Sequence, residues 1–195
     1  MPRERTDKKA ASHDRIVDAA ARAIRRNGYS GAAVADIMSD AGLTHGGFYA
    51  HFDSRDAMLA EAADRAGADS VAALTRIVAS APPERALHAL LKAYLSKAHV
   101  EAPESGCPLA AAGSEMPRQS PEVRAATTRR TKELIDLVAR QAPDWGQPGA
   151  HEQALVTVAT MVGTLLLARA VDDTKLADSL REAALNHLAP RPKKG

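Results

Sequence analysis

Apolar residues recur every three or four positions along most of the chain, which is the spacing of one face of an α-helix. The first clear stripe predicts a helix that follows Ser12 as its N-cap and stops at Asn27-Gly28. No segment alternates apolar and polar residues as a strand would. We therefore expect an all-α fold. The predicted helices cover about residues 13–27, 33–41, 45–52, 54–79, 83–100, 121–141, 150–171 and 173–189.

Neither a membrane span nor a secreted scaffold is predicted. The longest uncharged run covers residues 153–168, which is shorter than the roughly 20 residues that a membrane helix needs. The first residues are charged and are not followed by the apolar stretch of a secretory signal. Cys107 is the only cysteine, so it has no partner for an internal disulfide. We expect a cytoplasmic protein with no membrane partner.

A helix-turn-helix motif is predicted within residues 28–59. One short helix, a tight turn with glycine and a second short helix follow one another, and in such motifs the second helix enters the DNA major groove. Ala41 and Gly42 are small where the two helices cross and the chain must turn. The apolar residues that face each other across the turn are Val34, Ile37, Met38, Leu43, Phe48 and Phe52.

The motif has a specific residue order. It contains Gly28-Tyr29, Ile37, Ala41-Gly42-Leu43-Thr44, Gly46, Phe48-Tyr49, His51-Phe52, Arg55 and Leu59. This order resembles the DNA-binding domain of the TetR family of bacterial transcription regulators. The resemblance implies an N-terminal three-helix helix-turn-helix domain and a C-terminal helical domain for effector binding and dimerisation. The implied division is a flexible basic arm at 1–11, the DNA-binding domain with the start of a linking helix at 12–60, the ligand-binding and dimerisation domain at 61–189 and a disordered tail at 190–195.

The resemblance also implies which residues bind double-stranded DNA. In the family, the start of the second helix faces base edges, and here those positions are His45, Gly46 and Gly47. Because glycine has no side-chain donor, the two glycines imply close backbone approach, and His45 is the candidate for direct base readout. The positions that typically reach phosphates, and so fix the register on DNA, are Thr44, Tyr49, His51 and Arg55.

The net charge of +2 is unevenly distributed along the chain. Residues 1–26 hold eight basic and four acidic side chains, a net charge of +4. Residues 27–66 hold two basic and six acidic side chains, a net charge of −4, and residues 67–195 carry +2. The basic arm lies beside the motif, where it can follow the phosphate backbone or enter a minor groove. The alternative for residues 3–9 is a solvated tail.

The segment around Cys107 is distinctive outside the motif. Pro108 suits the first position of a helix, so Cys107 is expected at its N-cap, where the helix dipole stabilises a thiolate. The Gly106-Cys107 pair resembles the sequence at this position in many family members, in which the adjoining short helix lines the effector cavity. Cys107 is thus a candidate redox or electrophile sensor, and an inert buried residue is the alternative. The other candidates for an effector site are Leu109, Met116, Trp145 and Met161, with Tyr94 and His88 as polar ones.

The predicted helices at 150–171 and 173–189 carry apolar faces too extensive for one small domain to cover. Pairing with a twofold mate would bury them, so a homodimer is expected. Two recognition helices related by a twofold axis would bind a palindromic operator. Its half-sites would lie about one helical turn (~34–36 Å) or a multiple apart.

The motif and the family resemblance predict a ligand-responsive DNA-binding regulator. We expect it to be a repressor that a small effector releases from its operator. No cofactor, metal site or enzymatic activity is predicted. The paired histidines have no metal-ligand spacing, and no phosphate-binding glycine loop or nucleophile motif is present. Two alternatives remain open. One is a helical protein–protein adaptor in which the motif only packs, and the other is a thiol-based sensor acting through Cys107 in the same architecture.

Overall fold

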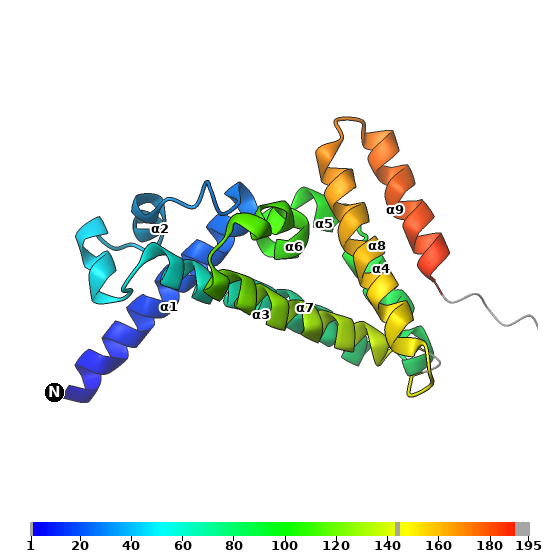
Figure 1. Cartoon of the computed structure of the whole chain (residues 1–195), viewed down its shortest axis with the longest axis horizontal. Helices are drawn as coiled ribbons and strands as arrows, with labels where there is room; N and C mark the ends of the chain where they lie inside the picture. The colour runs from blue at the N-terminus through cyan, green and yellow to red at the C-terminus, as the bar shows by residue number, and fades with distance from the viewer. Residues whose placement is uncertain (1, 143–144, 190–195) are drawn as a thin grey trace, which may run out of the picture. The chain divides into compact units, whose positions relative to one another are not determined.

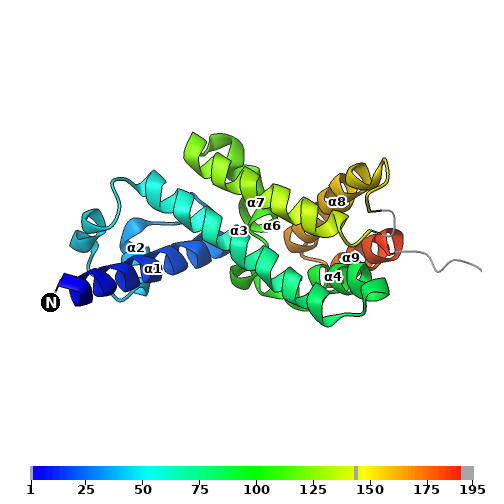
Figure 2. The ribbon, with the colours of Figure 1, turned by 90° about the horizontal axis from the view of Figure 1, so that it is seen from below.

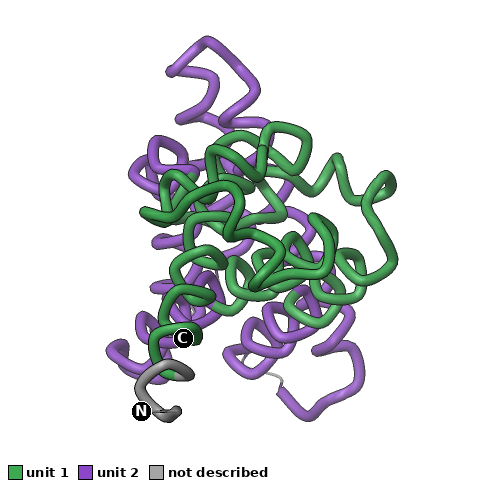
Figure 3. The backbone as a smooth tube through the Cα atoms, turned by 90° about the vertical axis from the view of Figure 1, so that its left-hand side faces the viewer, with its two compact units in different colours: residues 1–68, 104–130 green, residues 69–103, 131–195 purple. Residues whose placement is uncertain are grey.

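The computed structural model describes residues 2–142 and 145–189, with side chains from residue 7 onward. Every regular element within these residues is a helix, which confirms the all-α prediction. The chain divides into two compact units, coloured separately in Figure 3. Unit 1 comprises residues 1–68 and 104–130, and unit 2 comprises residues 69–103 and 131–195. The tail predicted at 190–195 lies outside the described residues.

Unit 1 begins with a long helix, α1 (Pro2–Asn27). It stops where predicted, because Gly28 adopts a φ of +74°. Its start differs from the prediction: Ser12 lies inside the helix, and a helix replaces the flexible arm predicted at 1–11 from residue 2 onward. Proline suits the first turn of a helix, and the residues that follow are mostly strong helix formers, so no signal interrupts the helix before Asn27.

Two segments of the chain build the rest of unit 1. The first holds α2 (Val34–Asp40), the 3₁₀-helix η1 (His45–Ala50) and the start of α3 (Arg55–Ser80). In the second, η3 (Pro103–Ser105) precedes α6 (Pro108–Ala112), η4 (Gly113–Arg118) and the start of α7 (Pro121–Ala139). Both α2 and α6 pack against α1, and Figure 2 shows α2 beside it.

One hydrophobic core joins the two segments of unit 1. Its largest buried side chains from the first segment are Ile16, Ile24, Tyr29, Ile37, Met38, Phe48, Phe52, Met58 and Leu59. The second segment contributes Ala112, Val123 and Ala126, and the half-buried Met116 packs against them. The boundary predicted between residues 60 and 61 divides the chain by function and stays a prediction. By packing, residues 104–130 belong with the N-terminal helices.

Unit 2 holds the remaining helices. They are η2 (Pro83–Arg85), α4 (Ala86–Tyr94), α5 (Lys97–Glu101), α8 (Ala150–Ala170) and α9 (Thr174–Leu188), together with the ends of α3 and α7. The single helix predicted over 83–100 is interrupted between α4 and α5. There Ser96 caps a new helix, because its Oγ accepts a hydrogen bond from the backbone N–H of His99 at 3.2 Å.

The last two helices, α8 and α9, lie side by side and antiparallel (Figure 1). Asp173 caps α9 by accepting hydrogen bonds from the backbone N–H groups of Lys175 and Leu176. By length and composition α8 could cross a membrane, and it is the one such helix in the described part of the chain. In unit 2 it packs against α9 instead, with Met161 and Leu165 fully buried.

Candidate nucleic-acid interface

The turn between α2 and η1 has the geometry that the sequence predicts. Gly42 adopts a φ of +69°, which a residue with a side chain rarely adopts. This conformation lets the N–H of Leu43 reach the carbonyl of Met38 at 2.9 Å. Ile37 and Met38 face inward from α2 and are almost fully buried. The turn therefore fixes the direction in which η1 leaves α2.

The second helix of the motif is a 3₁₀-helix, shorter and tighter than the α-helix predicted at 45–52. The N–H of Gly47 bonds to the carbonyl of Thr44, and the N–H of His51 bonds to the carbonyl of Phe48. Two adjacent glycines disfavour a regular α-helix, which explains the difference. The rings of Phe48 and Phe52 stack with centroids 5.6 Å apart and anchor the segment to the core.

The opposite face of η1 is exposed. Thr44, His45 and Gly46 are exposed, and 76% of Tyr49 is accessible to solvent. The fold does not explain the glycine at 46. A Cβ added there would meet nothing within 4 Å, and the φ of Gly46 is not positive. At Gly47 a Cβ would make only ordinary contacts with Met38 and Thr44. The packing of unit 1 therefore leaves room for side chains at both glycines.

His51 lies half-buried at the end of η1. Its Nδ1 is buried and has no hydrogen-bond partner among the described residues. Burial lowers the pKa of His51, and electrostatic interaction with His13 and Lys9 lowers it further. The ring of His13 lies 6.1 Å from that of His51, and its Nε2 hydrogen-bonds to Glu61 at 2.7 Å. A neutral imidazole carries a single N–H, so His51 has one proton to donate.

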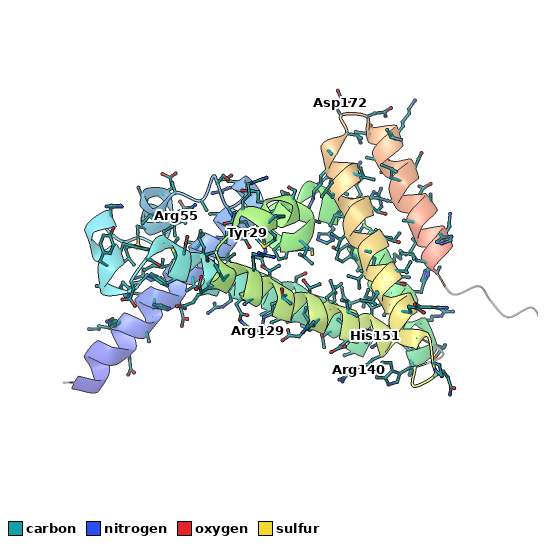
Figure 4. All side chains as sticks on the ribbon, in the orientation of Figure 1. Tyr29, Arg55, Arg129, Arg140, His151 and Asp172 are labelled. Atoms are coloured by element: carbon teal, nitrogen blue, oxygen red, sulfur yellow. The ribbon has the colours of Figure 1, made fainter. Side chains whose placement is uncertain are left out.

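Arg55, the first residue of α3, binds the backbone of the turn that precedes α2. Its Nη2 donates to the carbonyl of Tyr29 at 2.6 Å and to that of Ala32 at 3.2 Å. Figure 4 labels Arg55 and Tyr29. Sequence reasoning assigns Arg55 to phosphate and misses this contact. The guanidinium has five N–H donors, so a phosphate contact through the others stays a prediction.

Comparison with known proteins decides the family. The profile described as "Bacterial regulatory proteins, tetR family" matches residues 16–62. A second, described as "Transcriptional regulator LmrA/YxaF-like, C-terminal domain", matches residues 83–184, more than half of the chain. The chain belongs to the TetR family of bacterial transcription regulators. An uncharacterised HTH-type transcriptional regulator of Mycobacterium tuberculosis (strain H37Rv) is 32% identical over 184 residues, covering 90% of this chain and 93% of that protein.

Solved structures share the TetR fold. A TetR transcriptional regulator from Chloroflexus aurantiacus is 26% identical, with a TM-score of 0.75 over 93% of this chain and 94% of that one. The reduced form of NemR from Escherichia coli is 19% identical, with a TM-score of 0.77 over 91% of this chain and 94% of that one. At this identity the likeness to NemR concerns the fold alone.

In this TetR-family chain, a buried arginine ties residues 104–130 to the DNA-binding helices. Arg25 on α1 is 5% exposed. Its Nη2 donates to the carbonyl of Ala66 on α3 at 2.7 Å, and its Nη1 donates to the carbonyl of Glu104 at 3.3 Å. A buried guanidinium that binds carbonyls of two separate segments holds both to α1. Nothing in the local sequence marks Arg25 for this role.

A second tie joins α3 to α7 within unit 1. Asp64 accepts hydrogen bonds from Arg129 and from Arg130, whose Nη2 atoms each lie 2.5 Å from its carboxylate. The hydrogen bond from Arg130 is the main reason that the pKa of Asp64 lies below its usual value, because it outweighs the opposing effect of burial. Gly67 lies where α7 passes close to α3, and a Cβ there would overlap the side chain of Arg130. Sequence reasoning also misses this contact.

The structure distributes the predicted effector residues over both units. In unit 1, Cys107 is the N-cap of α6 with Pro108 at the first position, as predicted, and its side chain is 2% exposed. Leu109 and Met116 are half-buried in the same unit. In unit 2, Met161 is fully buried, whereas Trp145 is 53% exposed and does not belong to the core. The structure does not bring these residues together within one unit, so the effector site stays a prediction.

Each unit has an open cavity lined by other residues. A cavity of unit 1, about 450 Å³, lies between α1, α3 and α7, and one cavity of unit 2, about 400 Å³, lies between α5, α8 and α9. Charged side chains line both, and most of them bind one another or backbone carbonyls. Among the described residues, no group of three His, Cys, Asp or Glu side chains is placed to hold a metal ion.

Proposed function

We propose that this TetR-family regulator is a cytoplasmic homodimeric repressor that a small effector releases from a palindromic operator. The observation that supports DNA binding most directly is the two-sided η1. Phe48 and Phe52 anchor its inner face, while Thr44, His45, Gly46 and Tyr49 stand exposed on the other. Exposed polar and small residues on a rigidly anchored segment suit contact with a DNA groove.

We assign the DNA contacts by side-chain chemistry. His45 reads a base edge, and the missing side chains of Gly46 and Gly47 let the backbone approach the DNA. The exposed hydroxyls of Thr44 and Tyr49 and the N–H of a neutral His51 donate to phosphate oxygens. Phosphate contacts fix the register, so sequence preference rests mainly on His45.

We propose dimerisation through α8 and α9. Large apolar side chains stand exposed on this pair, including Val156 at 61%, Leu167 at 49% and Leu176 at 46%. A Cβ added to Gly163 would meet nothing within 4 Å, so a helix of a second copy could pack closely there. A twofold pair would cover these side chains and place two motifs on a palindromic site.

We propose that the effector binds the C-terminal part of the chain and shifts a two-state equilibrium. The effector would favour the state in which the two motifs of the dimer no longer match the operator spacing, and DNA affinity would fall. Thermodynamic linkage then requires that operator DNA weakens effector binding by the same factor.

The test is selection of duplexes from a random-sequence pool by the purified full-length protein. We expect enrichment of a palindromic sequence, and we expect its affinity to fall as salt is added, because phosphate contacts release counterions. His45→Ala should alter the base preference at one position of each half-site, and Tyr49→Phe should weaken binding to all sequences. A protein that enriches no sequence and whose weak DNA binding ignores salt would favour the adaptor alternative.

A further inference from the structure

A carboxylate from the second segment of unit 1 binds the turn between α1 and α2. Glu115 lies on η4, and its Oε1 accepts a hydrogen bond from the N–H of Tyr29 at 3.2 Å. Its Oε2 accepts from the N–H of Ser30 at 2.9 Å and from the Ser30 hydroxyl at 2.7 Å. Three donors thus converge on one side chain, which comes from 86 residues further along the chain.

Gly28 makes room for this carboxylate. Its φ of +74° already favours glycine, and a Cβ built on it would overlap Oε1 of Glu115. Two independent requirements, the backbone conformation and the close approach of a side chain, therefore fall on the same position. The turn is shaped around the Glu115 carboxylate.

Arg55 binds backbone carbonyl groups of the same turn. We define the 29–32 turn as residues Tyr29, Ser30, Gly31 and Ala32. Glu115 takes two of its N–H groups, and Arg55 takes the carbonyls of Tyr29 and Ala32. An anion and a cation from separate helices thus hold one short stretch of backbone. α2 begins two residues after the turn, at Val34.

We propose that Glu115 is a positioning residue for DNA binding. By fixing the 29–32 turn, it sets the direction of α2 and therefore of η1, which α2 carries through the Gly42 turn. This inference rests on the proposed function. It makes the DNA-binding geometry depend on η4, so residues 104–130 hold the motif in place in addition to sharing its core.

The experiment compares Glu115→Gln with Glu104→Gln in the full-length protein. Both variants remove one negative charge from the same segment, but the exposed Glu104 side chain makes none of these contacts. In either orientation, the glutamine amide turns an NH₂ group toward a donor of the 29–32 turn. We expect roughly tenfold weaker binding of Glu115→Gln to the duplex that the wild type selects. Glu104→Gln should bind like the wild type.

Two further readouts separate positioning from general stability. The amide hydrogens of Tyr29 and Ser30 should exchange faster in Glu115→Gln than in the wild type, and at the wild-type rate in Glu104→Gln. Exchange is measured at a temperature where circular dichroism shows that both variants are folded. Ser30→Ala removes only the hydroxyl donor and should weaken DNA binding about threefold. Combined with Glu115→Gln it should add less than its separate effect, because both substitutions change the same contact between Glu115 and the 29–32 turn.

The outcomes decide between the claims. The positioning role is overturned if Glu115→Gln binds DNA as tightly as Glu104→Gln, or more tightly. The proposed function still stands in that case, because the wild type binds its duplex. If Glu115→Gln does not fold, Ser30→Ala decides alone, and wild-type affinity of that variant overturns the inference. A wild type that selects no duplex refutes the proposed function instead.

Discussion

Gly46→Ala should stabilise the protein and weaken its binding to DNA. The added Cβ meets nothing within 4 Å in unit 1, and Gly46 does not adopt a positive φ. Replacing glycine by alanine at such a position reduces the entropy of the unfolded chain and favours the helix by about 0.5–1 kcal/mol. For a chain of this size, that corresponds to a rise in Tm of roughly 1–4 °C.

The same methyl group should act against the complex. A backbone N–H that donates to DNA brings its nitrogen to about 2.9–3.0 Å from the acceptor. The methyl group, two bonds from that nitrogen, then lies within van der Waals contact of the DNA and must be accommodated by a shift. Crowding of this kind costs about 1–3 kcal/mol in a well-packed contact, or roughly 5–150-fold in affinity. We therefore expect at least fivefold weaker binding of Gly46→Ala to the selected duplex.

Differential scanning fluorimetry and fluorescence anisotropy measure the two effects on the same preparations. Gly113→Ala is the matched control, because a Cβ at Gly113 also meets nothing within 4 Å. Gly113 lies outside η1, and the added methyl group touches neither Glu115 nor the 29–32 turn. It should gain Tm without losing affinity. Wild-type affinity of Gly46→Ala would refute the close backbone approach. A lower Tm of Gly46→Ala would show that the fold itself needs this glycine.

Three further predictions test other parts of the structure. Gly163→Lys places a charge on the proposed dimer face and should give monomers in analytical sedimentation. The control Ala72→Lys, on the exposed side of α3, should remain a dimer. If both variants remain dimers, α8 is not part of the interface. Burial alone would raise the pKa of Glu115, but its hydrogen bonds from Ser30 and Tyr29 outweigh this, so the folded pKa lies below the usual value. The carboxylate therefore stabilises the fold above about pH 4 and loses this effect as the pH falls through the folded pKa. The Tm difference between wild type and Glu115→Gln should then shrink in acid. A Tm difference that stays constant with pH would show that the contact is absent. Because Cys107 is 2% exposed, peroxide should leave DNA binding of the wild type and of Cys107→Ser equal, and selective release of the wild type would support the sensor alternative.

Local signals in the sequence predict most helix ends correctly. The stop at Gly28 and the turn at Gly42 follow from glycine's access to positive φ, and the N-cap position of Cys107 follows from the proline after it. Where two local signals compete, prediction fails. Ser12 is a good cap, but strong helix formers precede it and the helix runs through. Gly46 and Gly47 convert an expected α-helix to a 3₁₀-helix.

Long-range polar contacts leave no local signal. Glu115 and Tyr29 are 86 residues apart, and neither belongs to a periodic apolar stripe that would place it beside the other. The contact of Arg25 with Glu104 spans 79 residues, and that of Asp64 with Arg130 spans 66. Two glycines accompany such contacts: Gly28 makes room for Glu115 and Gly67 makes room for Arg130. Neither reveals its partner from the sequence, and the positive φ of Gly28 alone already explains that glycine. A single sequence therefore predicts the motif but not the groups that hold it.

These contacts also explain how a DNA-binding motif tolerates acidic surroundings. Residues 27–66 carry a net charge of −4, which by itself would repel phosphates. In the structure, Asp40 pairs with Arg26 of α1, Glu61 hydrogen-bonds to His13 of α1, and Asp64 binds two arginines of α7. The partners come from the helices α1 and α7, and unit 1 holds 14 basic and 13 acidic side chains, a net charge of +1 with histidine neutral. η1 itself has no acidic residue, and these contacts engage three of the six carboxylates of residues 27–66.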